Sequence, residues 1–518
     1  CDWSSDVCSS DLEPLMNKLL SPLLLMIATA HTVNGAEVDL LEGKTGYERR
    51  ASISEFADSI WENQTFSFDQ GLNMLQGLSN SDRYYAIKSM FGNNRSHHKL
   101  ISEPLSTEQI NTLLSGVGPQ REEIIQYLAD YGVPSPNMNA DQIQTLMGAA
   151  GSRRYDQPLR ALLGSNRLAQ NYGLSAFGVK EANQLLNQSH DRSGMIRYMA
   201  DRTLFTTALT VKEAEQIIGQ QGPMGRHDAV KALLGMNQQQ QDYLALPLSH
   251  ADALQLVRGS ALPEEIIRHF TNRGLFAAPL TATESQQLLQ DIQHTDRFNV
   301  VKSLLGENRQ QQGYLQLPLG LSEARTLLDG MAYQDEMIGL FTDHQALQSP
   351  LNPDEALQLL GSLTRADRYD ALSALLGNNE LQQSYLQNSI DATAASTLLE
   401  GSAYQDELIQ QMADIGSLQK MDGDHLIDLI QELFGENRYK AISALSGKNR
   451  LQHHYLSQPL SVKQLERLLE RSANPFLIIE QLGQQQLIEG PLSAEAIEPI
   501  LSQLYGDERA AATVLLTR

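Results

Sequence analysis

One short motif recurs along this chain at a nearly constant interval. It consists of a mostly apolar residue, a glycine, a variable residue and an asparagine. The glycines are Gly92, Gly164, Gly235, Gly306, Gly377 and Gly447, and the asparagines are Asn94, Asn166, Asn237, Asn308, Asn379 and Asn449. Successive glycines are about 71 residues apart throughout the series. A period of this kind predicts tandem structural units rather than one irregular globular domain.

A second marker, a single apolar residue such as Leu280, recurs at the same interval and sets the boundaries of the units. It falls at residues 66, 138, 209, 280, 351, 421 and 492 of the 518-residue chain. We therefore expect seven repeats over residues 66–518, the last one incomplete. The preceding segment, residues 36–65, is interpreted as a divergent half-repeat that caps the array at its N-terminal end.

Each repeat divides into two related halves, as in Leu248–Pro279 and Leu280–Pro318. Each half begins with a capping residue, followed about eight positions later by a pair of apolar residues. Thr281 and Glu284 form one of several capping boxes of the kind that starts a helix. The recurrent glycine is expected to end the second helix of the longer half with a positive φ angle. The asparagine is expected to cap a short third helix.

The pattern as a whole predicts an all-α fold. Alternating β-branched runs are missing, while Leu, Ala, Gln and Glu dominate. Helices of about ten residues are marginal on their own in water, so each must gain stability from its neighbours. We expect a solenoid of seven roughly 71-residue repeats, each with two hairpin-like halves and a short extra helix.

Over residues 40–518 the plan resembles α-solenoids built from paired helices. The repeat length is also similar to that of annexins, but the glycine-rich calcium loop of annexins is missing.

The N-terminus has the pattern of an export signal. Residues 1–15 are interpreted as a translation artefact and residues 16–35 as a signal peptide, with Lys18 before the short apolar stretch Leu19–Ile27. We therefore expect an exported protein, periplasmic or secreted. Both cysteines, Cys1 and Cys8, precede the expected cleavage site. The mature chain would then lack thiol chemistry and disulfides.

The charge balance limits the classes of partner. Acidic residues outnumber basic ones by 62 to 39, which gives a formal net charge of −23. Nucleic acids and anionic membrane surfaces attract basic proteins, so neither is expected as the main partner. No apolar run beyond the N-terminal region is long enough to predict a membrane span.

An arginine recurs nine residues before the glycine position. The series is Arg83, Arg226, Arg297, Arg368, Arg438 and Arg509, and Arg154 is one place out of step. One interpretation is an inter-repeat ladder, in which these arginines pair with acidic doublets such as Glu122-Glu123 and Asp406-Glu407. The alternative is an exposed row of guanidinium groups for a carboxylate-rich partner.

Other candidate residues favour structural roles. One tyrosine per repeat, as at Tyr385, is expected to fill a core position, although an exposed aromatic row for sugars or peptides is the alternative. The doublets His97-His98 and His453-His454 are poor chelates, because adjacent helical side chains point apart. We find no catalytic, phosphate-binding or dinucleotide motif, and we expect no catalytic residue, metal or cofactor.

These features favour an exported, non-enzymatic helical repeat scaffold that binds a protein or peptide partner along an extended surface. The alternative is the superhelical scaffold region of a larger periplasmic enzyme acting on the cell wall, with its catalytic domain outside this chain. The chain stops where the next glycine motif is due, which motivates that alternative.

Overall fold

The computed structural model describes residues 41–59, 65–95, 97–148, 155–361 and 363–517. Within these ranges the fold is all-helical, with 27 α-helices, one 3₁₀ helix and no β-strand, which confirms the all-α part of the predicted fold class. The predicted artefact and signal peptide lie outside the described residues, as do residues 36–40 and 60–64 of the predicted cap. Arg154 also lies outside them.

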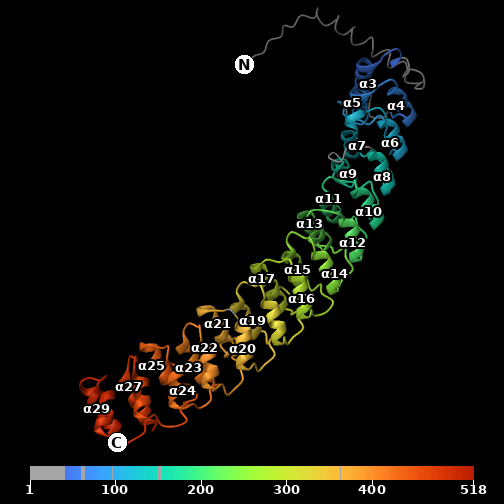
Figure 1. Ribbon diagram of the computed structural model, residues 1–518. Coiled ribbons are helices and arrows are strands. Elements are labelled where there is room, and N and C mark those ends of the chain that lie inside the picture. Colours follow the sequence, from blue (N-terminus) through green and yellow to red (C-terminus); the bar gives the residue numbers. More distant parts are fainter. Residues whose placement is uncertain (1–40, 60–64, 96, 149–154, 362, 518) are drawn as a thin grey trace, which may run out of the picture. The chain divides into compact units, whose positions relative to one another are not determined.

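The chain divides into two compact units, which meet in the sequence at Ala245 and Leu246. In both units the helices alternate along the chain between two rows (Figure 1). We call these the first-helix row and the second-helix row, because they hold the first and second helix of each hairpin. Neighbouring helices within a row pack on each other, for example α8 on α10 and α11 on α13.

The helices of the N-terminal unit have the following bounds. Its first-helix row contains α4 (Phe68–Met74), α6 (Thr107–Leu114), α8 (Ala140–Met147), α10 (Val179–Leu186) and α12 (Val211–Ile218). Its second-helix row contains α3 (Gly46–Ser59), α5 (Asn80–Met90), α7 (Arg121–Asp130), α9 (Asp156–Leu162), α11 (Arg192–Asp201) and α13 (Pro223–Leu233), with the 3₁₀ helix η1 (Gly118–Gln120) before α7.

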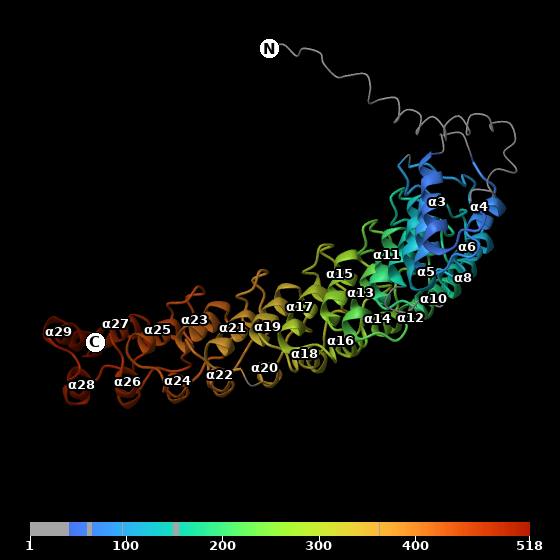
Figure 2. The same cartoon turned by 90° about the horizontal axis from the view of Figure 1, so that it is seen from above.

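The C-terminal unit continues the alternation (Figure 2). Its first-helix row contains α14 (His250–Val257), α16 (Ala282–Leu289), α18 (Leu321–Leu328), α20 (Pro353–Leu360), α22 (Ala392–Leu399), α24 (Gly423–Leu429), α26 (Val462–Leu469) and α28 (Ala494–Leu501). Its second-helix row contains α15 (Pro263–Arg273), α17 (His294–Leu305), α19 (Gln334–Asp343), α21 (Arg365–Leu375), α23 (Gln405–Ile415), α25 (Gly435–Leu445), α27 (Pro475–Gln484) and α29 (Gly506–Thr517).

The first helices begin as the capping boxes predict. At α16 the Thr281 hydroxyl accepts the backbone N–H of Glu284 at 3.2 Å, and the Glu284 carboxylate accepts the backbone N–H of Thr281 at 2.8 Å. The same reciprocal pair forms at Ser67, Ser106, Thr210 and Ser461. The apolar pair at the end of each helix, such as Leu288-Leu289, is buried between the two rows. Each helix is thus fixed at its start by local bonds and along its length by packing.

The longer and the shorter halves of a repeat are closed by the same pair of backbone hydrogen bonds. In the longer half, the backbone N–H of Leu280 donates to the Tyr314 carbonyl and the Leu280 carbonyl accepts from Gln316, each at 2.7 Å. In the shorter half, Leu248 makes the equivalent bonds with Leu275 and Ala277. The residue before each cap is therefore tied to the chain that follows the second helix.

The predicted short third helix is wrong. After the recurrent glycine the chain forms turns and returns as irregular backbone, as in residues 377–385. The asparagine that was expected to cap that helix has a different role, which is described below. Each longer half therefore contains two helices and an ordered loop.

Candidate functional site

The recurrent asparagines clamp the loops that follow the second helices. In each loop the side-chain amide of the asparagine donates to two carbonyls, one five residues earlier and one four residues later. For Asn379 these are Ala374 at 2.9 Å and Gln383 at 2.7 Å. Asn94, Asn166, Asn237, Asn308 and Asn449 make the same two bonds. The side-chain oxygen of Asn379 also accepts the backbone N–H of Gln383 at 3.1 Å. The asparagine therefore substitutes for a turn of helix by satisfying loop backbone groups itself.

The recurrent glycines lie where the chain leaves the second helix. Gly92, Gly164, Gly235, Gly306, Gly377 and Gly447 all have positive φ angles, between 81° and 127°, as predicted. At Gly377 a Cβ atom would lie 3.4 Å from the backbone nitrogen of Ser384. Both the dihedral angle and the close approach of the returning chain therefore favour glycine.

The recurrent arginines lie at the opposite end of the same helices. Arg368 is the fourth residue of α21 and is 8% exposed. Its guanidinium group donates to the carbonyls of Leu398 and Thr397, at 3.3 and 3.4 Å, in the last turn of α22. Arg83 binds Leu113 and Thr112 of α6 in the same way, and Arg438 binds Leu468 and Arg467 of α26. Each guanidinium therefore caps the next helix of the first-helix row.

The burial of these arginines favours contacts within the chain over an exposed row of guanidinium groups. Burial lowers the pKa of the Arg83, Arg368 and Arg438 guanidinium groups, but a guanidinium in a protein keeps its charge. Their positive charge lies against carbonyls at a helix C-terminus, where the helix dipole is negative. These three side chains therefore connect neighbouring hairpins and are not presented to an external carboxylate.

The other arginines of the series vary this arrangement. Arg297 donates to the carbonyls of Ile292 and Asp329. Arg226 forms a two-pronged ion pair with Glu215, and Arg509 pairs with Glu498 at 2.5 Å. Both glutamates occupy the fifth position of the first helix in the same hairpin. They are not members of the acidic doublets that we expected as partners.

In two of the acidic doublets, the second glutamate contacts a tyrosine. Glu123 accepts the hydroxyl of Tyr84 at 3.0 Å, and Glu407 accepts that of Tyr369 at 2.7 Å. Burial, followed by the neighbouring carboxylate, raises the pKa of both tyrosines to about 12. Asp406 is 3% exposed, and burial raises its pKa even though the Lys440 ammonium lies 4.0 Å away.

A second arginine series, which was not predicted from the sequence, performs the same capping function. Arg121 donates to the carbonyl of Leu146 in α8 and to the Asn111 side chain in α6. Arg192 does the same with Ile217 of α12 and Asn183 of α10. Both arginines join two successive first helices. They occupy equivalent positions in successive repeats, and so, very nearly, do Asn111 and Asn183, so the repeat period itself was the signal.

A third series, also not predicted, fixes the loops to the neighbouring hairpin. The residue after each recurrent asparagine donates its backbone N–H to a carboxylate or amide oxygen at the end of the preceding second helix. For Glu380 the acceptor is Asp343, at 2.8 Å. The equivalent acceptors are Asp58, Asp130, Asp201, Asn272 and Asp414. Each loop is therefore held internally by its asparagine and externally by a side chain of the preceding second helix.

The tyrosine at the fixed repeat position lies in the core, as predicted. Tyr172, Tyr243, Tyr314, Tyr385 and Tyr455 are all at most 4% exposed. The Tyr385 hydroxyl donates to the carbonyl of Thr342 at 2.7 Å, and Tyr172, Tyr243 and Tyr455 make the equivalent bond. This series therefore does not form an aromatic surface for sugars or peptides.

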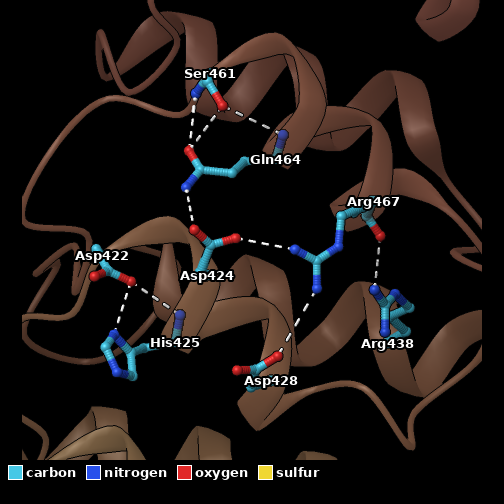
Figure 3. A network of polar contacts seen from close by, with 8 residues as sticks. All are labelled: Asp422, Asp424, His425, Asp428, Arg438, Ser461, Gln464 and Arg467. Carbon is cyan, nitrogen blue, oxygen red and sulfur yellow. Dashed lines mark hydrogen bonds and ion pairs between the residues drawn. The ribbon is translucent and has the colours of Figure 1, made fainter.

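The exposed side of the first-helix row carries polar contacts between neighbouring helices. In Figure 3, Asp424 of α24 accepts from Gln464 at 3.1 Å and from Arg467 at 2.9 Å, both in α26. The carbonyl of Arg467 in turn accepts from Arg438. Asp422 caps α24, and the backbone N–H of His425 lowers its pKa. Between α18 and α20 of the same row lies a groove of about 550 Å³, lined by Arg325, Asp329 and Gln358 among others.

The part of the chain that the structure describes contains no group of three or more His, Cys, Asp or Glu side chains arranged to hold a metal ion. Among the same residues, every helix is too short or too polar to cross a membrane. The histidine doublets bind backbone where their contacts are defined, as in the contact of the His454 ring with the Leu456 carbonyl.

No family model matches this chain, and no curated protein matches it.

Proposed function

We propose that this chain is an exported, non-enzymatic helical repeat scaffold that binds a protein or peptide partner along an extended surface. In this proposal, residues 66–518 form a solenoid of seven repeats, one for each step of the sequence period. Each repeat consists of two hairpins, and the segment before residue 66 caps the array. Export is proposed from the Lys18 and Leu19–Ile27 pattern, which lies outside the described residues.

The observation that carries the proposal is the recurrence of whole interaction sets, not of single residues. Hairpin closure, the asparagine clamp and the arginine cap return together from one repeat to another. Such recurrence is what stacked repeats require, because each unit must present the same interface to the next. Arrays of this kind commonly present long surfaces to other proteins, so the step from architecture to binding is one of analogy.

The surface chemistry of the first-helix row supports peptide or protein binding. Grooves run between neighbouring helices, at α14 and α16 as well as at α18 and α20. Their linings mix leucine with glutamine, arginine and aspartate side chains. Polar side chains of this kind hydrogen-bond to peptide backbone and side chains alike.

Affinity capture with the full chain tests this function. The chain is immobilised and exposed to envelope extract at two salt concentrations, beside an unrelated acidic helical protein of similar net charge as the control. We expect discrete proteins that bind the chain and not the control. Recovery of the same proteins on both would show charge-driven adsorption and would count against the proposal.

A further inference from the structure

The C-terminal unit exposes four aromatic side chains at the starts of its second helices. Tyr333, Tyr404, Phe434 and Tyr505 are 53%, 57%, 75% and 82% exposed, and they precede α19, α23, α25 and α29. Tyr333 and Tyr404 are one repeat period apart, and so are Phe434 and Tyr505. The tyrosines of the fixed repeat position, such as Tyr385, are by contrast at most 4% exposed.

Two of these residues also have an unfavourable backbone conformation. Tyr333 has φ 57° and ψ 47°, and Tyr404 has φ 50° and ψ 42°, both in the left-handed region. The equivalent residues before α15 and α27, Leu262 and Asn474, have φ near −130°. A bulky side chain in the left-handed region is uncommon and destabilising. The left-handed conformation also occurs at the starts of α5 and α21, at Asn80 and Arg365, so it is a recurrent feature of these helix starts. What distinguishes Tyr333 and Tyr404 is that this position holds an exposed aromatic ring.

The exposed tyrosines are held in fixed orientations by a second ring. The Tyr333 ring meets Phe298 of α17 edge-on, with centroids 5.6 Å apart. The Tyr404 ring meets Tyr369 of α21 at 5.2 Å in the same way. Edge-to-face contacts leave the face of one ring free for another group. The pairs also recur from one repeat to the next, so the unit presents similar aromatic positions at successive steps.

Exposed carboxylates are frequent in the same parts of the chain, in the connections that lead from first to second helices and in the first two turns of the second helices. They are Asp329, Glu336, Asp367, Asp370, Glu400, Glu407, Glu432, Glu436, Glu470, Asp507 and Glu508. Exposed cations in the same segments are fewer, namely Arg365, Lys440 and Arg471. Acidic residues in a first helical turn do stabilise a helix. Here, however, they also crowd one another, and burial together with Asp335 and Asp367 raises the pKa of Asp370.

We propose that these four aromatic residues and the exposed carboxylates of the same segments, which we call the acidic aromatic strip, bind a lysine- and arginine-rich segment of a partner protein. The proposal rests on the proposed function and specifies its partner. Ammonium and guanidinium groups are attracted both to carboxylates and to the faces of aromatic rings. The strip offers both, and a cationic partner would relieve the repulsion among its carboxylates. A neutral polysaccharide would use the rings but not the charge.

Fluorescence anisotropy with the full chain tests the strip. The probes are labelled decalysine, decaglutamate and a neutral glycine-serine decapeptide, and unlabelled neutral glycans serve as competitors. We expect decalysine alone to bind, with an affinity that falls as salt rises. The double variant Tyr404→Asn, Phe434→Ser should weaken decalysine binding at least fivefold. Asparagine is chosen at position 404 because it tolerates the left-handed conformation.

A further double variant tests the contribution of the carboxylates, and a single variant outside the strip serves as the control. Glu407→Gln with Glu436→Gln should also weaken binding at least fivefold, since it removes two carboxylates of the strip. Tyr47→Ser removes an exposed tyrosine of the N-terminal unit, 67% exposed, and should leave binding unchanged. Thermal melting of each variant confirms that the fold is retained, and either strip variant alone is sufficient for the test.

The outcomes distinguish this proposal from the proposed function. Unchanged decalysine binding in the aromatic variant, or displacement of labelled decalysine by a neutral glycan, would overturn the acidic aromatic strip. If the chain still captured partners from the extract, the proposed function would stand without it. If neither peptides nor envelope proteins bound, both proposals would fail together.

Discussion

At the scale of single residues, the recurrent arginines show how one unfavourable interaction is offset by others. Arg368 lies in the first turn of α21, where a cation opposes the helix dipole. The same guanidinium reaches the last turn of α22, where the dipole favours a cation and the carbonyls otherwise lack partners. The contact with α22 is buried and hydrogen-bonded, so it offsets the unfavourable interaction with the dipole of α21.

Replacing Arg368 with glutamine should therefore destabilise the contact between α21 and α22. A hydrogen bond to a charged group contributes about 2 kcal/mol, and the carbonyls of Thr397 and Leu398 would lose theirs. We expect faster amide hydrogen exchange in α22 and a lower urea midpoint. The matched control is Arg309→Gln, which changes an exposed arginine. Equal exchange in the two variants would show that Arg368 does not stabilise this contact.

The buried carboxylate of Asp406 predicts a pH dependence of stability. Burial raises its pKa in the folded chain above the value in the unfolded chain. The folded state then binds the proton more tightly, so this carboxylate stabilises the fold at low pH and loses that effect as pH rises through its folded pKa. Asp406→Asn should therefore gain stability relative to the wild type as pH rises from about 3 to 7.

Melting temperatures of the wild type and Asp406→Asn across this pH range check the sign. Asp354→Asn, at an exposed carboxylate in the first turn of α20, is the comparison, and it should give a smaller change. A difference between wild type and Asp406→Asn that stays constant with pH would refute the assignment.

At the scale of helices, the first-helix row combines local capping with packing between neighbours. α26 is eight residues long, which is too short to persist alone in water. Its start is fixed by Ser461 and Gln464, and its exposed side is tied to α24 through Asp424 and Arg467 (Figure 3). Capping sets where the helix begins, whereas the neighbouring helix keeps it folded.

Removing the cap of α26 should have a local effect. Ser461→Ala deletes the hydroxyl that accepts the backbone N–H of Gln464, and loss of such a cap costs about 1 kcal/mol. We expect faster amide exchange in the first turn of α26, with little change in α22. The control is Ser457→Ala, an exposed serine in the preceding loop. Equal exchange at Gln464 in both variants would contradict the capping role.

At the scale of the whole chain, the proposed repeat makes a strong prediction about deletions. Residues 280–350 span one step of the period, from Leu280 to the residue before Leu351. Their removal joins Pro279 to Leu351 and restores the order of hairpins on both sides. Since each repeat contacts only its neighbours, the shortened chain should keep its helical content per residue and melt cooperatively.

A deletion that is out of step with the period provides the control. Removing residues 285–344 takes away a shorter segment than one period and joins unlike positions of two repeats. Circular dichroism should show a loss of helix beyond the deleted segment in that variant only. If the in-step deletion lost as much helix as the out-of-step one, the proposed repeat architecture would be wrong.

The sequence by itself determined the helical fold class, the starts of the helices and the buried tyrosines. These depend on interactions within a few residues, such as the capping pair at Thr281 and Glu284, or on apolar spacing that one helix turn fixes. The positive φ at the recurrent glycines is likewise a local property.

The tertiary structure decided which partners the recurrent polar side chains have. Arg368 binds carbonyls about 30 residues away. Because every residue carries a backbone carbonyl, the residue type does not identify the acceptor. Asn379 clamps a loop instead of capping a helix because the returning chain places the Gln383 carbonyl within its reach. The exposure of Tyr404 likewise depends on which neighbour packs beside it, and sequence position alone does not specify that.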